Sequence, residues 1–240
     1  MIDVYWSPWS NMDIYEGCNM IYDDPYPLAK YYNSLMEKNN LHDNFLKCPA
    51  HVNYTKNIFC LPQPFDIDVV IENGQLIDVA KNKASNLNHF YQMKAPSLVG
   101  KNTINIYSNW IFFSEEPLIL ESMPAFMHNT GLQNSGFYVP GTFDISKWFR
   151  PLEGAIQLWD GVTTIKCNAG DPLFYARFMT DEKIRLRRFN LTPEIREISK
   201  ACMHVKRYKT IKNLDKLYEM FQNRGKHRQL LNLIEQNLVE

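Results

Sequence analysis

The sequence predicts an all-β fold, an antiparallel β-sandwich or a jelly-roll or β-clip-like domain over residues 1–190, followed by a basic helical tail over residues 191–240. Three observations carry this prediction. Short apolar runs recur at roughly 8–12 residues and are separated by turn signals, without helices between them. Aromatic residues make up 13% of the 240 residues, and flat rings pack well on pleated strands. From residue 192 onward, apolar residues recur at helical spacing instead.

The first half of the chain begins with a strand and a helix. Residues 2–9 (IDVYWSPW) alternate well enough to predict an edge strand. Residues 27–38 carry apolar side chains at helical spacing and predict a short helix. From about residue 43 the period changes to two, so residues 43–79 predict three or four short strands. Asn73-Gly74 lies between two of these and predicts a tight hairpin turn, because both central residues of such a turn need positive φ.

The second half continues as strands and then becomes helical. Residues 90–97 and 103–127 read as strands, and residues 129–136 (NTGLQNSG) form a loop by composition. A hairpin-like unit and a half-exposed strand follow before residue 190. Thr192, Pro193 and Glu194 then predict a capped helix start. Further helices are expected over residues 214–221 and 230–238.

The charge of the chain is zero in total but unevenly distributed. From residue 182 to the end, 14 Lys and Arg face 7 Asp and Glu, a net of +7, so the remaining residues carry −7. This pattern predicts that the basic tail docks on an acidic surface, either that of a protein partner or that of its own body. No run approaches the ~20 apolar residues needed to span a bilayer. The acidic N-terminal stretch lacks a secretion signal pattern, so we expect neither membrane insertion nor secretion.

The five cysteines are scattered and form no C-x-x-C pair. In a chain without a secretion signal, such thiols usually act as small buried apolar groups. A metal site, if present, would use Cys48, His51 and Cys60, because thiolate and imidazole suit zinc. Its fourth ligand would have to come from far along the chain. We therefore expect no metal and no other cofactor, with Cys48 and Cys60 buried in adjacent strands and His51 at a strand end.

No catalytic constellation is complete in the sequence. The chain has no G-x-S-x-G, no P-loop and no G-x-G-x-x-G. None of its six histidines stands in the H-x-D/E or H-x-H pair typical of non-haem iron sites. Nucleic-acid binding would rest on Arg185, Arg187 and Arg188, with Phe189 for stacking and the basic stretch 206–209. The neutral total charge disfavours that function.

The most unusual run is GTFDISKWFRPLEGAIQL, residues 141–158. Asp144 lies three residues before Lys147 and four before Trp148, so these side chains are neighbours if the segment forms a helical turn. Arg150 precedes a proline and must leave that turn in an extended conformation. It can pair with Asp144 or Asp171 and stack on an aromatic ring. Two interpretations stay open: a structural staple at the entry to a second sheet, or a ligand-binding site formed by Asp144, Trp148, Arg150 and Asp171.

The same run, together with AGDPLFYARF further on, resembles the core of the dUTPase and dCTP-deaminase β-clip proteins. In that family an Asp, an aromatic residue and a G-E-I strand precede a G-D-x-I-x-Q-L turn, and here Asp144, Trp148, LEGAIQL and GDPL follow in that order. The Arg-Ser-Gly phosphate motif is missing, and no Gln follows GDPL. The resemblance therefore implies a β topology, and a nucleotide hydrolase or deaminase-like enzyme is the alternative function.

A second resemblance extends over residues 43–190. The order FLKCPAHVNYTKNIFCLPQPFDIDV, NWIFFSEEPLILESMPAFM, VPGTFDISKWFRPLEGAIQL and AGDPLFYARF is similar to that of uncharacterised proteins of tailed phages, particularly phages of marine cyanobacteria. This resemblance implies a viral context, in the virion or in the host cytoplasm. Together with the incomplete catalytic motifs, it predicts a protein that acts by binding a protein partner.

Overall fold

Strands with apolar side chains on both faces determine the layers of the fold. The computed structural model describes residues 1–9, 22–39, 45–73, 75–79, 91–94, 102–208, 219 and 225–239. In strand β7 (Thr103–Phe113), Trp110 and Phe112 point to one cluster of buried residues, whereas Ile111 and Phe113 point to another. Because successive side chains of a strand point to opposite faces, each such strand must be covered twice.

Two sheets lie face to face and enclose the inner core. Sheet A has the strand order β14-β1-β7-β11-β9, and β6 also pairs with β7. The bounds of the strands of sheet A other than β7 are β14 (Ile184–Arg188), β1 (Ile2–Pro8), β11 (Pro151–Leu158), β9 (Gly136–Tyr138) and β6 (Tyr91–Lys94). Sheet B has the order β10-β8-β13-β3-β2, with β10 (Gly141–Asp144), β8 (Ile119–Met123), β13 (Pro172–Phe178), β3 (Ile58–Pro62) and β2 (Tyr26–Pro27). Inner-core residues such as Trp110 of β7 and Phe174 of β13 belong to one cluster, so the two sheets share it.

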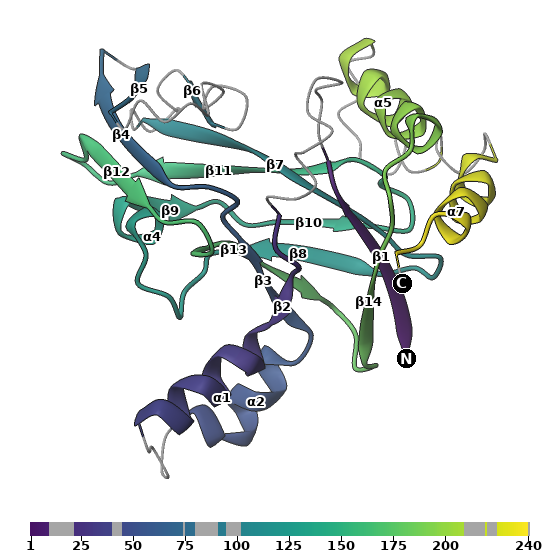
Figure 1. Ribbon diagram of the computed structural model, residues 1–240, viewed down its shortest axis with the longest axis horizontal. Coiled ribbons are helices and arrows are strands. Elements are labelled where there is room, and N and C mark those ends of the chain that lie inside the picture. Colours follow the sequence, from purple (N-terminus) through teal and green to yellow (C-terminus); the bar gives the residue numbers. More distant parts are fainter. Residues whose placement is uncertain are drawn as a thin grey trace.

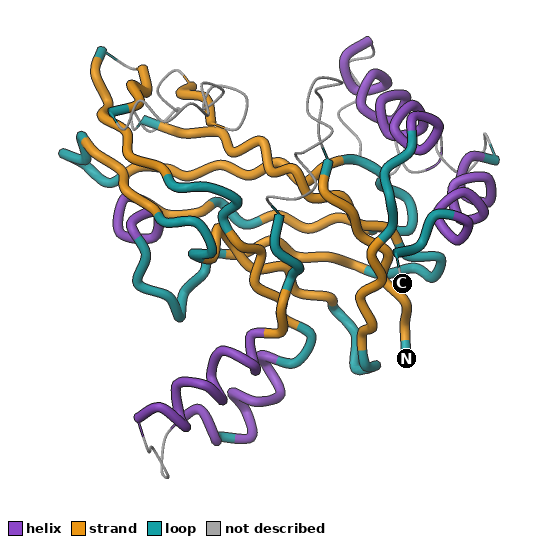
Figure 2. Tube along the Cα trace, viewed as in Figure 1, coloured by secondary structure: helices purple, strands orange, loops and turns teal. Residues whose placement is uncertain are grey.

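A third, smaller sheet and a short helix extend the sandwich at one end. Sheet C has the order β12-β4-β5, with β12 (Thr164–Cys167), β4 (Ile67–Glu72) and β5 (Gln75–Asp78). Its Val69 and Ile165 join the inner core. The short helix α4 (Gly131–Ser135) lies next to β12. The strands fill the centre of the molecule (Figure 2).

Helices cover the outer faces of both sheets. On sheet A, α5 (Pro193–Tyr208) and α7 (Lys226–Gln236) bury Ile195, Ile198 and Ile234 against Phe113. On sheet B, Leu28 and Tyr32 of α1 (Leu28–Asn39) join a third cluster with residues of β3 and β13. A 3-10 turn (Phe45–Lys47) and α2 (Pro49–Thr55) accompany α1. The pair α5 and α7 lies on the opposite side of the strands from α1 and α2 (Figure 1).

Several predictions are confirmed. The fold is mostly β, the helix over residues 27–38 is α1, and the Asn73 turn joins β4 to β5, with Asn73 at φ 50°. The start of α5 is capped as expected, because the Ile195 N–H donates to Thr192 Oγ1 at 3.4 Å. The helix expected over residues 214–221 lies outside the described residues. No helix among the described residues combines the length and the apolar character that a membrane crossing requires.

Other predictions are wrong. Strand β1 is not an edge strand, because it lies between β7 and β14, and its pairing with β14 is parallel rather than antiparallel. Residues 45–55 are helical rather than extended, since Pro49 begins α2 at a position where its missing N–H costs no hydrogen bond. Part of the expected loop 129–136 is α4.

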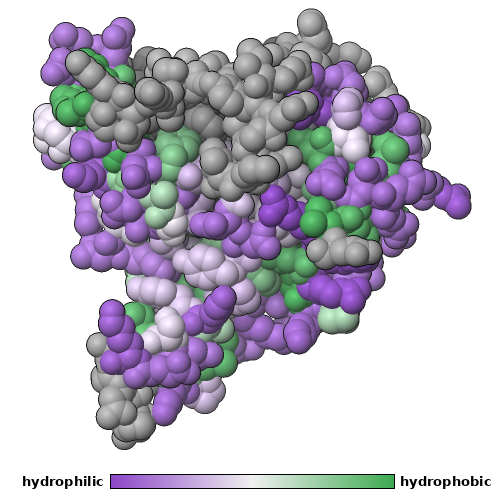
Figure 3. Space-filling view, viewed as in Figure 1, coloured by the Kyte–Doolittle hydropathy of each residue, from purple (hydrophilic) through white to green (hydrophobic). Residues whose placement is uncertain are grey.

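On the face shown in Figure 3, hydrophobic side chains form only small patches among hydrophilic ones.

We predict that α7 unfolds together with the sheets. Ile234→Ala should lower the free energy of unfolding by about 2–5 kcal/mol, because it leaves a cavity between α7 and sheet A. The measurement is urea unfolding followed by tryptophan fluorescence, to which the buried Trp110 of sheet A contributes, with the exposed Gln236→Ala as the control. An unchanged midpoint for Ile234→Ala would mean that α7 is an independent tail.

Candidate functional site

The unusual run of residues 141–158 includes one of the points where the chain crosses from sheet B to sheet A. Strand β10 pairs with β8 in sheet B, and β11 pairs with β7 in sheet A. The residues between them, 145–150, form what we call the crossing turn. Asp144 organises its start: its Oδ1 accepts hydrogen bonds from the N–H and hydroxyl of Ser146 at 3.0 and 2.6 Å, and its Oδ2 pairs with Lys147 Nζ at 2.9 Å.

The electrostatics of Asp144 follow from these contacts. Burial by itself would raise the pKa of this carboxyl, but the hydrogen bonds from Ser146 and Lys147 outweigh burial and lower the pKa below its ordinary value of 3.8. Asp144 is therefore ionised at neutral pH although it is only 5% exposed. A buried carboxylate held this way fixes the conformation of the turn.

Two residues of the crossing turn, four positions apart, enter different cores. Ile145 is buried in the inner core, whereas Phe149 is buried in the cluster under α5 and α7, edge-on to Phe113 at 5.9 Å between ring centroids. Arg150 places its guanidinium 4.6 Å from the Trp148 ring centroid, and its Nη2 lies 4.0 Å from Glu153 Oε1. The expected stack on Trp148 is present. The structure pairs Arg150 with Glu153, a partner that we did not expect.

Asp171 does not join the other three residues of the predicted ligand site. It precedes β13, where Phe178 lies opposite Leu120, and Leu120 in turn lies opposite Phe143 of β10. Seven residues separate Asp171 from Phe178, which is about 23 Å along a strand. Asp144, Trp148 and Arg150 therefore lie together, and Asp171 lies toward the other end of sheet B.

The three candidate metal ligands occupy different environments. Cys48 is exposed immediately before α2, His51 is half-buried in α2, and Cys60 is buried in β3. Our expectation that Cys48 is buried in a strand is wrong, because the segment is helical. Burial raises the pKa of the Cys60 thiol to about 12, although a hydrogen bond with Tyr26 opposes this shift. Among the residues that the structure describes, no group of three His, Cys, Asp or Glu could hold a metal ion.

The arginines proposed for nucleic-acid binding are engaged with acidic residues. Arg185 donates to both carboxylate oxygens of Asp3 at 2.6 Å, and Arg187 lies 3.5 Å from the same carboxylate. Arg188 donates to Asp24 Oδ1 at 3.0 Å. Phe189 is 1% exposed and is not accessible for stacking on a base. Two carboxylates thus offset most of the charge of these three arginines within the chain.

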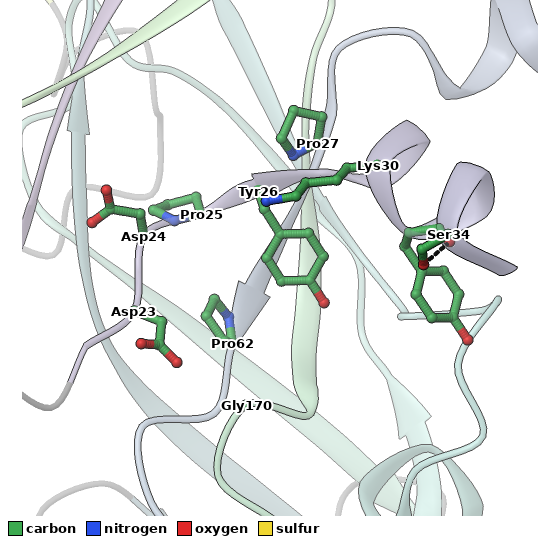
Figure 4. A pocket seen from close by; sticks show the side chains of 10 residues that line it. Asp23, Asp24, Pro25, Tyr26, Pro27, Lys30, Ser34, Pro62 and Gly170 are labelled. Atoms are coloured by element: carbon green, nitrogen blue, oxygen red, sulfur yellow. Dashed lines mark hydrogen bonds between the residues drawn. The ribbon is translucent and has the colours of Figure 1, made fainter. Parts of the chain in front are cut away.

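A pocket that the sequence did not indicate lies beside α1. Its volume is about 610 Å³. We call it the α1 pocket, and it is lined by Asp23, Asp24, Pro25, Tyr26, Pro27, Lys30, Tyr31, Ser34, Pro62 and Gly170. Asp23 and Asp24 stand at one end and Ser34 at the other, with Tyr26 and Lys30 between them (Figure 4). The wall is thus formed by the edge strand β2, the first turns of α1, and the turns at the end of β3 and before β13.

Contacts behind the wall hold the ring of Tyr31 in place. It stacks on His128 at 3.8 Å between ring centroids, with 28° between the ring planes. His128 Nδ1 is hydrogen-bonded to the hydroxyl of Tyr175, and this hydroxyl also accepts from the Met127 N–H at 3.3 Å. Burial lowers the pKa of His128 to about 4, so the imidazole is neutral at pH 7. Because His128 does not line the pocket, it supports Tyr31 from behind.

Tyr26 is also oriented from within. Its hydroxyl is hydrogen-bonded to the thiol of Cys60, and burial raises the pKa of Tyr26 above its ordinary value of 10.0. Asp171 directly follows Gly170 of the pocket wall, and its carboxylate contributes to this rise. The N–H of Gly170 donates to Gln63 O at 2.8 Å, and the Gln63 N–H donates to Asp171 O at 2.7 Å, so the turn before β13 is fixed to the loop after β3.

The sequence contains one signal for this pocket. The run DDPYP, residues 23–27, combines two carboxylates with a tyrosine between two prolines. Its last residues predict the start of a helix, and the spacing within a helix cannot indicate that Pro62 and Gly170, from distant parts of the chain, complete a pocket wall.

The chain matches no protein-family model, and neither a curated protein nor a solved structure is significantly similar to it.

We predict that the crossing turn is a structural staple that depends on the shape of the guanidinium. Arg150→Lys should lower the free energy of unfolding by about 1–2 kcal/mol, because an ammonium does not reproduce the planar stack on Trp148. Thermal or urea unfolding measures the loss, and the exposed Arg228→Lys is the matched control. Equal stability of the two variants would contradict the staple.

The lowered pKa of Asp144 leads to a pH-dependent effect. A lowered pKa means that the folded state binds the proton less readily than the unfolded state, so this carboxylate stabilises the fold above its ordinary pKa of 3.8 and loses the effect as the pH falls through its folded value. Asp144→Asn should therefore cost about 1–3 kcal/mol at pH 7 and progressively less below pH 4. Urea unfolding of both proteins between pH 3 and pH 7 tests this, and a difference that does not change with pH would contradict it.

Proposed function

We propose that the protein acts by binding, and that the α1 pocket receives an extended segment of a partner protein. The observation that carries this proposal is the composition of the pocket wall, in which two inwardly anchored tyrosine rings stand among three prolines. Tyrosine offers a large contact area at a low cost in conformational entropy and is enriched at binding hot spots. Prolines restrict the backbone near the rings, so the pocket loses little conformational entropy when a partner binds.

The chemistry of the pocket supports binding over catalysis. None of its lining residues that the structure describes is a histidine or a cysteine, and Ser34 donates its hydroxyl to Tyr31 O at 2.8 Å. Asp23 and Asp24 could act as general bases, but they stand at the end of the pocket opposite the Ser34 hydroxyl (Figure 4), so among the described lining residues no base lies beside that hydroxyl, as acyl or phosphoryl transfer would require. The pocket is also open to solvent. Sites for small molecules usually enclose most of the ligand, whereas an open wall suits a segment of a larger partner.

The resemblance of residues 43–190 to tailed-phage proteins supplies the context of this proposal. The partner is then another virion protein or a host component, met in the virion or in the host cytoplasm. The basic segment that begins at residue 182 supports a second contact, with an acidic surface. In the described part of that segment, α5 and α7 use their apolar sides to cover sheet A, which leaves their polar sides for such a contact.

A small-ligand enzyme with a β-clip-like topology is the second candidate. One observation favours it: the Gly170-Asp171 turn, which carries part of that resemblance, borders the α1 pocket. A panel of nucleotides tested by thermal shift separates the two functions. A nucleotide that raises the melting temperature of the wild type, and not that of a pocket variant, would favour the enzyme.

Selection from a displayed library of random peptides tests the binding function. The wild type should enrich a family of peptides, and Tyr31→Ala should lose at least tenfold in affinity for them, because one of the two aromatic rings of the wall is removed. Tyr54→Ala, which truncates an exposed tyrosine outside the pocket, is the matched control and should bind as the wild type does. Circular dichroism confirms that both variants fold.

The proposal fails on either of two results. One is that no peptide is enriched on the wild type. The other is that the enriched peptides bind Tyr31→Ala and Asp23→Lys as tightly as they bind the wild type. Asp23 is exposed, so its substitution should leave folding intact and should separate loss of binding from loss of structure.

A further inference from the structure

We infer that the segment recognised in the α1 pocket is proline-rich, adopts the polyproline II conformation and carries one basic residue beside its prolines. This inference rests on the binding function proposed above and names the class of partner.

The pocket is built on a sheet edge that does not accept another strand. Among the described residues, β2 is the last strand of sheet B and consists only of Tyr26 and Pro27. Pro25 precedes it, so prolines stand on both sides of Tyr26. A peptide that adds a strand needs a row of free N–H and C=O groups, and prolines interrupt such a row. An extended ligand must therefore bind here in another conformation.

Polyproline II meets this requirement. It forms no internal hydrogen bonds and keeps its backbone solvated, so it does not depend on a strand partner. Two turns of this helix span about 19 Å, and they present proline rings along each side. Aromatic-lined grooves recognise such segments by packing their rings between the prolines of the ligand. Tyr26 and Tyr31, held from behind by Cys60 and His128, form a wall of this type.

The donors in the pocket match the acceptors of such a ligand. A proline-rich backbone offers carbonyl oxygens and almost no N–H groups. Pro25, Pro27 and Pro62 of the wall supply no backbone N–H, so the donors for these carbonyls must be side chains. Lys30, which lies next to Tyr26 (Figure 4), offers an ammonium donor. A carbonyl of the segment can therefore accept a hydrogen bond from Lys30.

The charges around the pocket call for one basic residue. Among the described residues, the carboxylates include Asp23, Asp24 and the nearby Asp171, and the cations include Lys30 and Arg188, the latter paired with Asp24. In this part of the structure the carboxylates outnumber the cations. Asp23 is exposed and forms no ion pair with any residue that the structure describes, so it is the group that a ligand cation would meet. The basic residue of the segment should thus lie at the Asp23 end of the pocket.

Fluorescence anisotropy with synthetic peptides tests this inference. The probe is a fluorescein-labelled peptide of eight prolines with one arginine near its end. The wild type should bind it at least tenfold more tightly than either a peptide in which glutamate replaces the arginine or a glycine-serine peptide that keeps the arginine. Tyr31→Ala should weaken binding of the probe at least tenfold, because a stacked ring is lost, whereas Tyr54→Ala should change it less than twofold.

A charge exchange gives a second readout that a folding defect cannot imitate. Asp23→Lys should weaken binding of the arginine peptide about tenfold and should bind the glutamate peptide more tightly than the wild type does. Raising the salt concentration from low to physiological should reduce both effects. The inference is overturned if the glycine-serine peptide binds as well as the proline peptide. It is also overturned if Asp23→Lys does not weaken binding of the arginine peptide and strengthen binding of the glutamate peptide.

The two proposals fail on different results. If the random library yields peptides that depend on Tyr31 but contain no proline, the binding function stands and the polyproline II partner is wrong. If neither the library nor the synthetic peptides bind, both are wrong.

Discussion

The burial of central strands on both faces is the constraint on which the rest of the structure depends. In β7 the sequence Trp110-Ile111-Phe112-Phe113 alternates between the inner core and the cluster under α5 and α7. In β13, Phe174 and Ala176 face the inner core, whereas Tyr175 faces α1. Each sheet therefore needs the other sheet on one side and helices on the second side. Burying a large apolar side chain contributes about 1.5–3 kcal/mol to the free energy of unfolding, so removing either the facing sheet or the helices would destabilise the fold strongly.

This constraint also explains how the crossing turn and the α1 pocket arise. The chain has to cross between the sheets, and at the crossing turn Ile145 and Phe149 enter cores on opposite sides of sheet A. On sheet B, α1 covers only part of the outer face because it leaves the sheet directly after the two-residue strand β2. The α1 pocket is the space beside this departure. Its aromatic wall continues the third cluster, since Tyr31 and His128 lead to the buried Tyr175.

Local features of the fold could be predicted from the sequence, whereas features that depend on distant residues could not. Thr192 and Pro193 define a helix start, and Asn73 a hairpin, through neighbours only a few residues away. The runs WIFF and LFYA indicate strands, but an apolar run does not reveal which element covers each face. The short helix α2 was missed because its Val52 and Tyr54 are exposed, so no buried stripe marks it. The α1 pocket was missed because Pro62 and Gly170 reach it only through the pairing of β3 with β13.

The position of β1 has a consequence for how the chain acquires its structure. Ile2 pairs with Ile184 and Tyr5 pairs with Phe113, so the strand at the beginning of the chain has both of its neighbours far away in sequence. During synthesis this strand, with its buried Val4 and Trp6, has no partner until the chain has been made as far as Trp110, the first residue of β7 that pairs with it. Non-local pairing of this kind slows folding and prolongs the exposure of apolar surface. Sheet A can therefore close only late, and a nascent chain that stops before β7 emerges leaves an aromatic strand that chaperones would have to shield.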